Sequence, residues 1–585
     1  MTAEPADLNA DELRAKAVAA ARGVEPFDLL LAGGQVADVI TGKLRTADVG
    51  VSGPLIASVH PAGTRRDALK TCDAAGMVIA PGLIDAHMHI ESSMVTPRTY
   101  GETVLKRGVT TIVWDPHEFG NVWGVKGVIW AVKQAGLAPL RVLTLAPSCI
   151  PSAPGLETSG AEIDADSLRE VLSLPGIHGL AEVMDMNGVV AREPRMASIV
   201  QQGLLSGKPI FGHARSLTGA DLNAYAASGI SSDHEITSSA DLRSKIESGL
   251  FIELRGSHDH LLPDFVRTLL EYEQLPQTVT LCTDDVFPDD LSESGGVDDV
   301  VRRLIHYGMP PMNALRAATL NAASRLLRQD LGAVAPGRRA DIVVFDDLIS
   351  CKAEFVFLGG VEADQLKIPA PTFGALPRAM SLRPFCSEDF EVRSQSRRVR
   401  VATIDQPRFT KWGEAVADVV NGRVLAPIGA IRMAVVNRHG SQSSPKVAFL
   451  RGWGDWRGAF CTTVSHDSHN LTVFGSDTED MAVAANAVLA AGGGLAVASD
   501  GAVNALLPLP IAGLVSERPV SEVGASFKAV RTAMDDIVTW KPPYGVFKAC
   551  FGASLACNPG PHLTDLGIAD MARQTILASP VLGAA

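Results

Sequence analysis

The sequence predicts an α/β protein built on a (β/α)8 TIM-like barrel, with a small split β-sandwich module and a C-terminal α/β domain. Between residues 78 and 285, short apolar runs alternate with helical stretches, which is typical of parallel βα units. Eight such units favour a closed barrel, although spacing alone also allows an open doubly wound sheet. No GxGxxG motif follows an early strand, so a dinucleotide-binding version lacks support. The predicted barrel strands are Val78–Asp85, Thr110–Trp114, Arg141–Ala146, Gly179–Val183, Pro209–Gly212, Gly229–Asp233, Leu250–Leu254 and Thr278–Thr283.

The rest of the chain divides around this barrel, because 585 residues imply several domains. A helical segment that ends at Gly23 comes first. Strand-like runs with glycine turns follow it, including Asp28–Ala32 and Val36–Val39, and similar runs return after the barrel, which predicts one β module split in sequence. A Pro-, Arg- and Ser-rich connector then leads to the C-terminal domain. The predicted domains are 1–26, 27–77 together with 331–385, 78–330, and 396–585.

The composition excludes several classes of function. The net charge is −13 and aromatic residues make up 5%, so neither a phosphate-neutralising surface nor a base-stacking platform is expected, and nucleic acid is excluded as a partner. Eight scattered cysteines without a CxxC pair argue against a disulfide scaffold and a zinc ribbon. The acidic N-terminus does not resemble a signal peptide, and no apolar run reaches the length of a membrane span. A cytoplasmic protein is the expectation.

The most informative segment is Pro81–His89, with the sequence PGLIDAHMH, at the end of the first predicted barrel strand. Residues i and i+2 of a strand point the same way, so His87 and His89 present two imidazoles to one side. They lie at the C-terminal end of the strand, which is the face where barrel enzymes place their active sites. Neutral imidazole is a common metal ligand, and this position favours a metal site over two ordinary strand-end histidines.

Four further polar side chains follow later predicted strands at the same end of the barrel. A carboxylate inside an apolar run is costly unless it is paired or bound to a metal. Each residue alone has a simpler explanation, namely a strand-end polar group satisfied by backbone or water. Together with His87 and His89 they provide four histidines and two carboxylates, which suits two divalent cations bridged by a carboxylate and a hydroxide. The four residues are Glu182, His213, His234 and Asp284.

The chain resembles the amidohydrolase superfamily in two specific motifs, Pro81–His89 and Leu331–Phe345, and the similarity covers about residues 28 to 360. Within the superfamily it is most similar to the bacterial adenine deaminase family. Glu182 stands where many relatives carry a carboxylated lysine, and no lysine lies between Gly179 and Asn187. The other shared segments extend the likeness over nearly the whole chain; they are His89–Met94, Trp114–Glu118, His234 with Glu235, and Ser465–Asn470.

This resemblance implies hydrolysis of adenine to hypoxanthine and ammonia, by attack of a metal-bound hydroxide on C6 of the purine. The metals that it implies are two divalent ions, Mn or Fe, while the ligand types also fit Zn. The expected partner is a small purine base, and the larger barrels of the family are often dimers, so a homodimer or higher oligomer is expected. The resemblance assigns His87, His89 and Asp284 to one metal, His213 and His234 to the other, and Glu182 to both as the bridge.

Two carboxylates are candidates for proton transfer in such a reaction. Asp284 is placed to accept the hydroxide proton and pass it on. Glu235, next to His234, is the candidate for proton delivery to N1 or to the leaving amine. The alternative for Glu235 is a partner that orients the ligand histidine, which is common in metal sites. The family pattern favours catalysis.

Other polar residues have weaker assignments. The second HxH pair, His258 and His260, lies beyond a strand end, so we interpret both as loop histidines. His466 and His469 could close over the active site from the C-terminal domain, or they could have a structural role. Four residues near the predicted barrel mouth are candidates for substrate binding: Glu91, Ser92, His117 and Glu118.

Three alternatives to this function stay open. One is another amidohydrolase that acts on a cyclic amide, such as a dihydropyrimidinase or dihydroorotase, although these enzymes usually employ the missing lysine. Another is a cytosine deaminase, which commonly uses one metal without an equivalent of Glu182. The last is a non-catalytic paralogue, which would be expected to have lost one or more of His87, His89 and Asp284.

Overall fold

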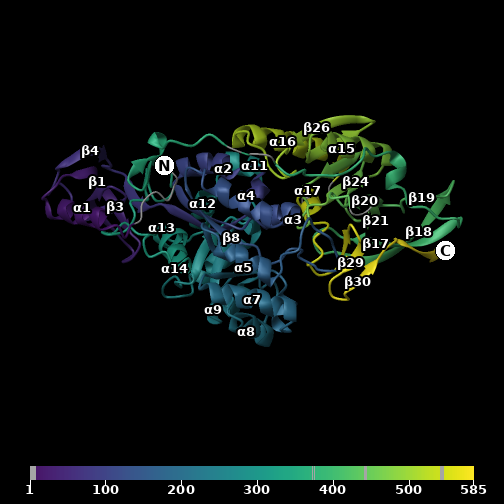
Figure 1. The fold of residues 1–585 in the computed structure, drawn as a ribbon, viewed down its shortest axis with the longest axis horizontal. Helices are drawn as coiled ribbons and strands as arrows, with labels where there is room; N and C mark the ends of the chain where they lie inside the picture. Colours follow the sequence, from purple (N-terminus) through teal and green to yellow (C-terminus); the bar gives the residue numbers. More distant parts are fainter. Residues whose placement is uncertain (1–7, 372, 374–375, 441–443, 540–545) are drawn as a thin grey trace.

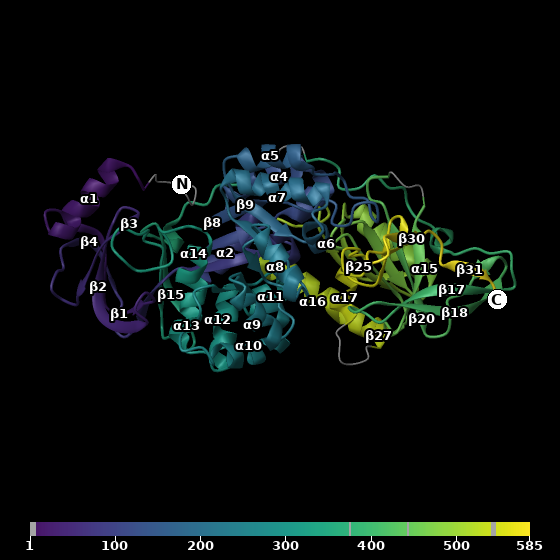
Figure 2. The same ribbon diagram turned by 90° about the horizontal axis from the view of Figure 1, so that it is seen from below.

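The computed structural model describes residues 8–371, 373, 376–440, 444–539 and 546–585, so residues 1–7 of the predicted N-terminal segment lie outside the described part. Three bodies follow one another along the longest axis (Figures 1 and 2). The β module with its N-terminal helix lies at one end, the barrel in the middle, and the C-terminal domain at the other end. None of the described helices combines the length and the apolar character needed to cross a membrane.

The strands of the β module, for which the sequence predicts a sandwich, are hydrogen-bonded in one series of eight. The runs Asp28–Ala32 and Val36–Val39 belong to a single long strand, β1, which pairs with β2 along its length. A bulge at Gly33–Gly34 bends β1, so its first half pairs with β4 and its second half with β5. Gly33 has a φ of 75°, and a side chain at Gly34 would overlap Ile79, so both positions of the bulge favour glycine.

The β module is split in sequence, because β14, which follows the barrel, pairs with β5, which precedes it. The predicted strand Val78–Asp85 consists of two strands, because β5 pairs with β14 and β1 in the module. The elements of the module are α1 (Asp11–Arg22), β1 (Phe27–Asp38), β2 (Lys43–Ser52), β3 (Leu55–Pro61), β4 (Ala68–Asp73), β5 (Val78–Pro81), β14 (Ile342–Phe345), β15 (Ala353–Leu358), β16 (Val361–Glu362) and the 3-10 turn η5 (Ala363–Gln365).

The barrel strands form two parallel sheets, one of five strands in the order β10-β9-β8-β7-β6 and one of three in the order β11-β12-β13. A few hydrogen bonds join the sheets at each seam. The amide of Asp284 donates to the carbonyl of His87 over 3.1 Å, and that of Ser231 donates to the carbonyl of Ile210 over 3.2 Å. The strands are β6 (Leu83–Met88), β7 (Val109–Trp114), β8 (Arg141–Ala146), β9 (Ile177–Val183), β10 (Ile210–Gly212), β11 (Ser232–Asp233), β12 (Phe251–Arg255) and β13 (Val279–Cys282).

Helices lie outside these strands, as Figures 1 and 2 show. Amphipathic helices such as α5 turn leucine and valine toward the strands, and Asp164 caps α5 by accepting the amide of Ser167. The helices are α2 (Pro97–Val104), α3 (His117–Trp123), α4 (Val125–Ala135), α5 (Ala165–Ser173), α6 (Met186–Val190), α7 (Pro194–Ser206), α8 (Gly219–Ala227), α9 (Ser239–Glu247), α10 (Leu262–Leu269), α11 (Pro288–Glu293), α12 (Val297–His306), α13 (Pro311–Arg316) and α14 (Ala322–Arg325), with the shorter turns η1 (Ile90–Ser93), η2 (Leu105–Arg107), η3 (Gly256–Leu261) and η4 (Ala317–Asn321).

The C-terminal domain is built on a ten-stranded sheet whose main path runs β19-β18-β17-β21-β20-β24-β23-β25-β26, with β31 beside β17. Helix α15 packs on this sheet through its alanines, Val488 and Met481. The elements are η6 (Ser387–Phe390), β17 (Arg398–Asp405), β18 (Lys411–Val420), β19 (Arg423–Val424), β20 (Ala430–Val436), β21 (Lys446–Arg451), β22 (Asp455–Trp456), β23 (Ala459–Thr462), β24 (Leu471–Gly475), α15 (Thr478–Ala490), β25 (Gly494–Ser499), β26 (Ala502–Pro508), α16 (Val520–Ile537), β27 (Val538–Thr539), α17 (Val546–Phe551), β28 (Pro561–Thr564), β29 (Gly567–Asp570), β30 (Thr575–Leu577) and β31 (Val581–Ala584).

The C-terminal domain and the barrel share one hydrophobic core. The rings of Phe287, beside α11, and Phe527, on α16, stack with centroids 5.0 Å apart. Just before α16, the amide of Ser516 donates to the carbonyl of Met94 over 3.0 Å, and Glu517 accepts the hydroxyl of Thr96 over 2.6 Å. These contacts fix the C-terminal domain next to η1, which follows the His87–His89 motif.

Candidate metal centre

The six strand-end residues predicted as ligands meet at one end of the barrel. Asp284 Oδ1 lies 3.7 Å from Nε2 of His87 and 3.2 Å from Nε2 of His89. Glu182 Oε1 lies 3.8 and 3.3 Å from the same two nitrogens. The last strand end therefore meets the first, because the barrel closes between β13 and β6.

Glu182 occupies the middle of this cluster and faces histidines with both of its oxygens. Its Oε1 faces His87 and His89, whereas its Oε2 lies 2.7 Å from Nδ1 of His213 and 3.3 Å from Nε2 of His234. The carboxylate is buried, with 4% of its side chain exposed. One buried carboxylate between two pairs of imidazoles is the arrangement expected of a bridging ligand.

Backbone contacts and buried carboxylates hold these side chains in place. The Nδ1 atom of His89 lies 3.1 Å from the carbonyl of Asp115, which leaves Nε2 with its lone pair toward Glu182. Asp85, on β6, accepts the amide and the hydroxyl of Thr283 over 3.0 and 2.6 Å and so fixes the turn before Asp284. Asp284 itself has a φ of 59°, which is uncommon for a residue other than glycine and occurs often at functional sites.

A separate ion-pair group, which we call the Lys245 cluster, supports the fifth and sixth strand ends. It consists of Asp233, Asp241 and Lys245. The fully buried ammonium of Lys245 lies 2.7 Å from Asp233 Oδ2 and 3.1 Å from Asp241 Oδ1. The other oxygen of Asp233 accepts the amides of Ala214 and Glu235, over 2.7 and 3.1 Å. These are the residues that follow His213 and His234, so the Lys245 cluster orients both imidazoles through the backbone.

Electrostatics within the centre favour a bound cation. Burial and the neighbouring imidazoles hold the pKa of His87 well below its usual value, and both of its ring nitrogens lack a hydrogen-bond partner among the described residues. Burial also opposes charge on His89, but the surrounding carboxylates outweigh it and hold the pKa of His89 well above its usual value. The carboxylates thus attract positive charge to this point, and a divalent metal ion bound to neutral imidazoles would supply that charge in place of the proton on His89.

Four overlapping groups of side chains could hold a metal ion, since their ligand atoms lie within 4.8 Å of one another. All six predicted ligands occur in these groups, and Asp115, His117, Glu118 and His466 occur with them. The groups are His87–His234–Asp284, Glu182–His213–His234, His89–Asp115–His117–Glu182, and His117–Glu118–His466.

Glu235 lies outside these groups and contacts two arginines. Its carboxylate accepts Arg215 over 2.9 Å and forms an ion pair with Arg255. Arg255 also contacts Asp284 through Nε and lies 3.2 Å from Asp285. A guanidinium group therefore connects Glu235 to the predicted ligand Asp284.

The four predicted substrate-binding residues lie around the same centre. Glu91 accepts the indole N–H of Trp114 over 2.8 Å, and burial together with the charge of Glu118 holds the pKa of Glu91 well above its usual value. Ser92 donates to Asp285 over 2.5 Å. His117 and Glu118 begin α3, and both are buried.

Several residues of the centre escaped the sequence analysis. Arg255 ends β12, so the strand-end rule that found the ligands could also have found it. Asp115 follows β7 directly, within the segment Trp114–Glu118, so the strand-end rule applies to it as well. Asp467 lies 3.8 Å from His117 Nε2, and its position in a loop of the C-terminal domain gives no periodic signal.

The remaining histidines behave differently from one another. His466 reaches the centre, with Nδ1 3.9 Å from Glu118 Oε1. His469 is buried, and its Nδ1 accepts the amide of Ser465 over 3.1 Å, which indicates a structural role. His258 and His260 lie in η3, and neither occurs in the four candidate metal groups.

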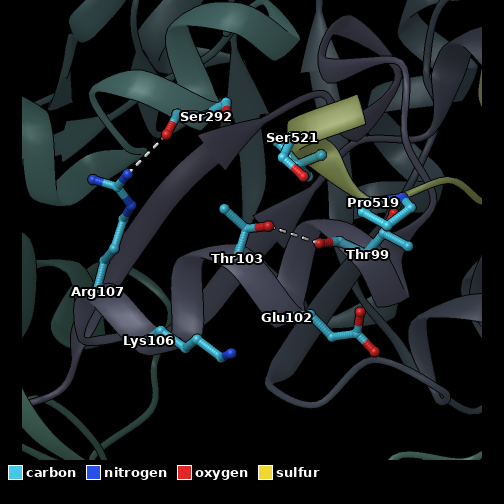
Figure 3. A pocket seen from close by; sticks show the side chains of 9 residues that line it. Thr99, Glu102, Thr103, Lys106, Arg107, Ser292, Pro519 and Ser521 are labelled. Carbon is cyan, nitrogen blue, oxygen red and sulfur yellow. Dashed lines mark hydrogen bonds between the residues drawn. The ribbon is translucent and has the colours of Figure 1, made fainter. Parts of the chain in front are cut away.

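A surface hollow of about 350 Å³ lies between α2 and the start of α16, as Figure 3 shows. Arg107 crosses its edge and donates to the carbonyl of Ser292 over 3.0 Å. None of its lining residues belongs to the centre. The lining residues are Thr99, Glu102, Thr103, Lys106, Arg107, Ser292, Pro519, Val520 and Ser521.

Comparisons with known proteins agree on one family. Residues 78–366 match the model of the Amidohydrolase family, and residues 407–575 match the Adenine deaminase C-terminal domain. The chain is 59% identical to Adenine deaminase 2 of Agrobacterium fabrum and 58% identical to that of Rhizobium johnstonii, in each case over 99% of this chain and 98% of the relative. It is 49% identical to the adenine deaminase of Klebsiella pneumoniae, over 96% of this chain and 94% of the relative.

Proposed function

The chain belongs to the adenine deaminase family, and we propose that it hydrolyses adenine to hypoxanthine and ammonia at the histidine–carboxylate centre of the barrel. Support comes from the nearly full-length likeness to adenine deaminases, which includes the C-terminal domain. The observation that carries the chemistry is Glu182, whose two oxygens face separate pairs of imidazoles.

The amidohydrolase family uses divalent metals, and the centre offers the ligands for them. When bound, such ions lower the pKa of water and supply a nucleophile at neutral pH. We propose Mn or Fe, as the resemblance implies, although imidazole and carboxylate ligands also suit Zn. His87, His89 and Asp284 would hold one ion, His213 and His234 the other, and Glu182 both.

Asp284 is the proposed proton acceptor. Burial opposes its charge, but Arg255 and the imidazoles outweigh burial and hold the pKa of Asp284 well below its usual value, so the ionised form is available to take a proton. The net reaction leaves the oxygen of water on C6 and releases the exocyclic amine as ammonia. Two protons from water must therefore move, one to N1 and one to the leaving amine.

Glu235 is proposed either to deliver one of these protons or to orient its neighbours. Its ion pairs with Arg215 and Arg255 support the orienting role, because both guanidinium groups stabilise the ionised carboxylate. Glu235→Gln separates the two roles. Lost turnover with intact metal content and an altered pH–rate profile would support proton delivery, whereas lost metal would support orientation of His234.

The substrate is proposed to contact the polar groups that border the centre. A neutral purine offers nitrogen donors and acceptors along its edge, which match buried carboxyl, hydroxyl and imidazole groups better than a basic surface. The residues proposed for this role are Glu91, Ser92, His117 and Glu118. A homodimer or higher oligomer is part of the proposal and is tested by light scattering of the purified protein.

One assay tests the function. The purified protein is loaded with Mn²⁺ and mixed with adenine, and ammonia release is followed, with adenosine, cytosine and a dihydropyrimidine in parallel. We expect turnover of adenine above the other three compounds. Turnover of the dihydropyrimidine or of cytosine, with none of adenine, would contradict the proposal and favour the cyclic-amide or pyrimidine alternative. No turnover of any compound by fully loaded protein would favour a non-catalytic paralogue.

A further inference from the structure

A second set of buried polar side chains lies beside the centre, at the contact between the barrel and the C-terminal domain. His117 and Glu118 begin α3, whereas His466 and Asp467 come from the loop between β23 and β24. Two nitrogens alternate with two oxygens in this set. His117 Nε2 lies 3.8 Å from Glu118 Oε1 and 3.8 Å from Asp467 Oδ1, and His466 Nδ1 lies 3.9 and 3.8 Å from the same two oxygens.

These atoms face one another without making hydrogen bonds, because their separations exceed hydrogen-bond distance. His117 Nε2, both oxygens of Glu118 and Asp467 Oδ2 are buried and lack a hydrogen-bond partner among the described residues. The exposed fraction is 0% for Glu118 and 3% for Asp467. Two buried carboxylates without hydrogen bonds to these oxygens are costly, so the set as it stands is incomplete.

The orientation of His117 points to what completes the set. Its Nδ1 lies 3.1 Å from Asp115 Oδ2, and this carboxylate accepts the Nδ1–H. A histidine that binds a metal is neutral, and with its Nδ1–H held by Asp115 its lone pair is then on Nε2, which faces Glu118 and Asp467. A carboxylate behind a histidine, with the free nitrogen turned toward other ligands, is the usual arrangement of metal-binding histidines.

We propose that His117, Glu118, His466 and Asp467 bind a third divalent cation, which ties the C-terminal domain to the barrel. Two imidazoles and two carboxylates suit Mn²⁺, Fe²⁺ or Zn²⁺. Metal–ligand distances of about 2.0–2.2 Å place neighbouring ligand atoms about 3.0–3.6 Å apart. The nitrogen–oxygen separations of 3.8–3.9 Å are longer, so the four side chains must move inward when an ion binds. The nitrogens of His117 and His466 lie within 4.8 Å of each other, which suits one ion better than the flat edge of a base.

This site goes beyond the two cations of the proposed function, and it assigns His117 and Glu118 to metal binding in place of the contact with adenine proposed above. The test is the metal content of the full-length protein at equilibrium. Wild type, His466→Ala and Glu118→Gln are dialysed against saturating Mn²⁺, and metal and protein are measured in each sample. We expect about three ions per chain in wild type and about two in each variant. His260→Ala is the matched control, because it removes an exposed histidine of η3, and it should keep about three.

Two results would overturn the proposal. One is a metal content of about two ions per chain in wild type. This result is measured on wild type alone, so it overturns the proposal even if His466→Ala fails to fold. The other is about three ions in both wild type and His466→Ala, which would place the third ion elsewhere. The adenine assay separates this proposal from the function. If His466→Ala binds one ion fewer than wild type but wild type does not deaminate adenine, the third site is supported and the proposed function is contradicted. If wild type deaminates adenine but His466→Ala binds as many ions as wild type, the function is supported and the third site is contradicted.

Discussion

The barrel buries carboxylates in two neighbouring regions that are neutralised in different ways. In the Lys245 cluster, Asp233 and Asp241 share a fully buried ammonium group. In the metal centre, Glu182 faces four imidazoles, which are neutral when they act as metal ligands. A lysine supplies a permanent positive charge, whereas neutral imidazoles leave the charge of the carboxylate to be balanced by an ion.

This difference indicates that the Lys245 cluster supports the structure, whereas the centre is a candidate site for metal binding and catalysis. Asp233 directs its second oxygen to two backbone amides, so the Lys245 cluster is complete without a ligand. The centre has buried polar atoms without hydrogen bonds, including both ring nitrogens of His87. We therefore expect changes in the centre to affect activity and metal binding, and changes in the Lys245 cluster to affect stability.

The largest effect is expected for Asp284→Asn in the centre. The amide keeps the size of the side chain but removes the negative charge and the ability to accept a proton, so kcat should fall by at least about 10³. The measurement is ammonia release from adenine, with urea unfolding as a test of folding. Asp264→Asn, on an exposed pair of α10, is the control and should keep full activity. An Asp284→Asn variant within tenfold of wild type would break the assignment of this carboxylate to the chemistry.

Lys245→Met tests the other side of the comparison. It removes the ammonium but keeps a long side chain, so two buried carboxylates lose their partner, and the free energy of unfolding should fall by about 3–5 kcal/mol. Arg243→Met on the same helix breaks only the exposed pair with Glu271, and it should cost about 0–1 kcal/mol. Urea unfolding measures both. Equal losses of unfolding free energy in the two variants would mean that the Lys245 cluster stabilises the fold no more than an exposed ion pair does.

The sequence predicts those residues of the site that lie at the ends of barrel strands. Parallel strands of a barrel end on one face. An apolar run followed by a polar residue is therefore enough to predict that His87, His213 and Asp284 lie close together. The same rule extends to Arg255, which ends β12. The sequence showed the members of the centre, but not their partners: the contact between Glu235 and two arginines depends on how neighbouring strand ends meet.

The parts that the sequence did not predict depend on long-range pairing. The glycine pair after Ala32 predicts a turn, but Gly33–Gly34 forms a bulge within β1, because the chain pairs with β2 on both sides of it. The strand Val78–Asp85 was assigned to the barrel, although its first half pairs with β14, far away in sequence. Asp467 reaches the centre from a loop more than 300 residues after His117, and no local periodicity marks such a contact.

The smallest effect is expected for a change at His439, which tests whether neighbouring carboxylates determine the charge of an imidazole inside the protein. His439, in the C-terminal domain, is the opposite case to His89: burial and the charge of Arg438 lower its pKa to about 4, with only a weaker opposing contribution from Asp565. Its folded pKa lies below the unfolded value of about 6.5, so the unfolded chain binds more protons between these values, and stability falls as the pH drops through this window.

Between pH 7 and pH 5 this histidine should therefore cost wild type about 1–2 kcal/mol of unfolding free energy, and His439→Gln should not show this loss. Urea unfolding at both pH values measures the difference. The pH dependence of the metal centre cancels, because both proteins contain it. His306→Gln, at an exposed position of α12, controls for the loss of a histidine and should follow wild type. If His439→Gln loses as much stability as wild type, this half-buried imidazole does not cause the loss of stability at low pH.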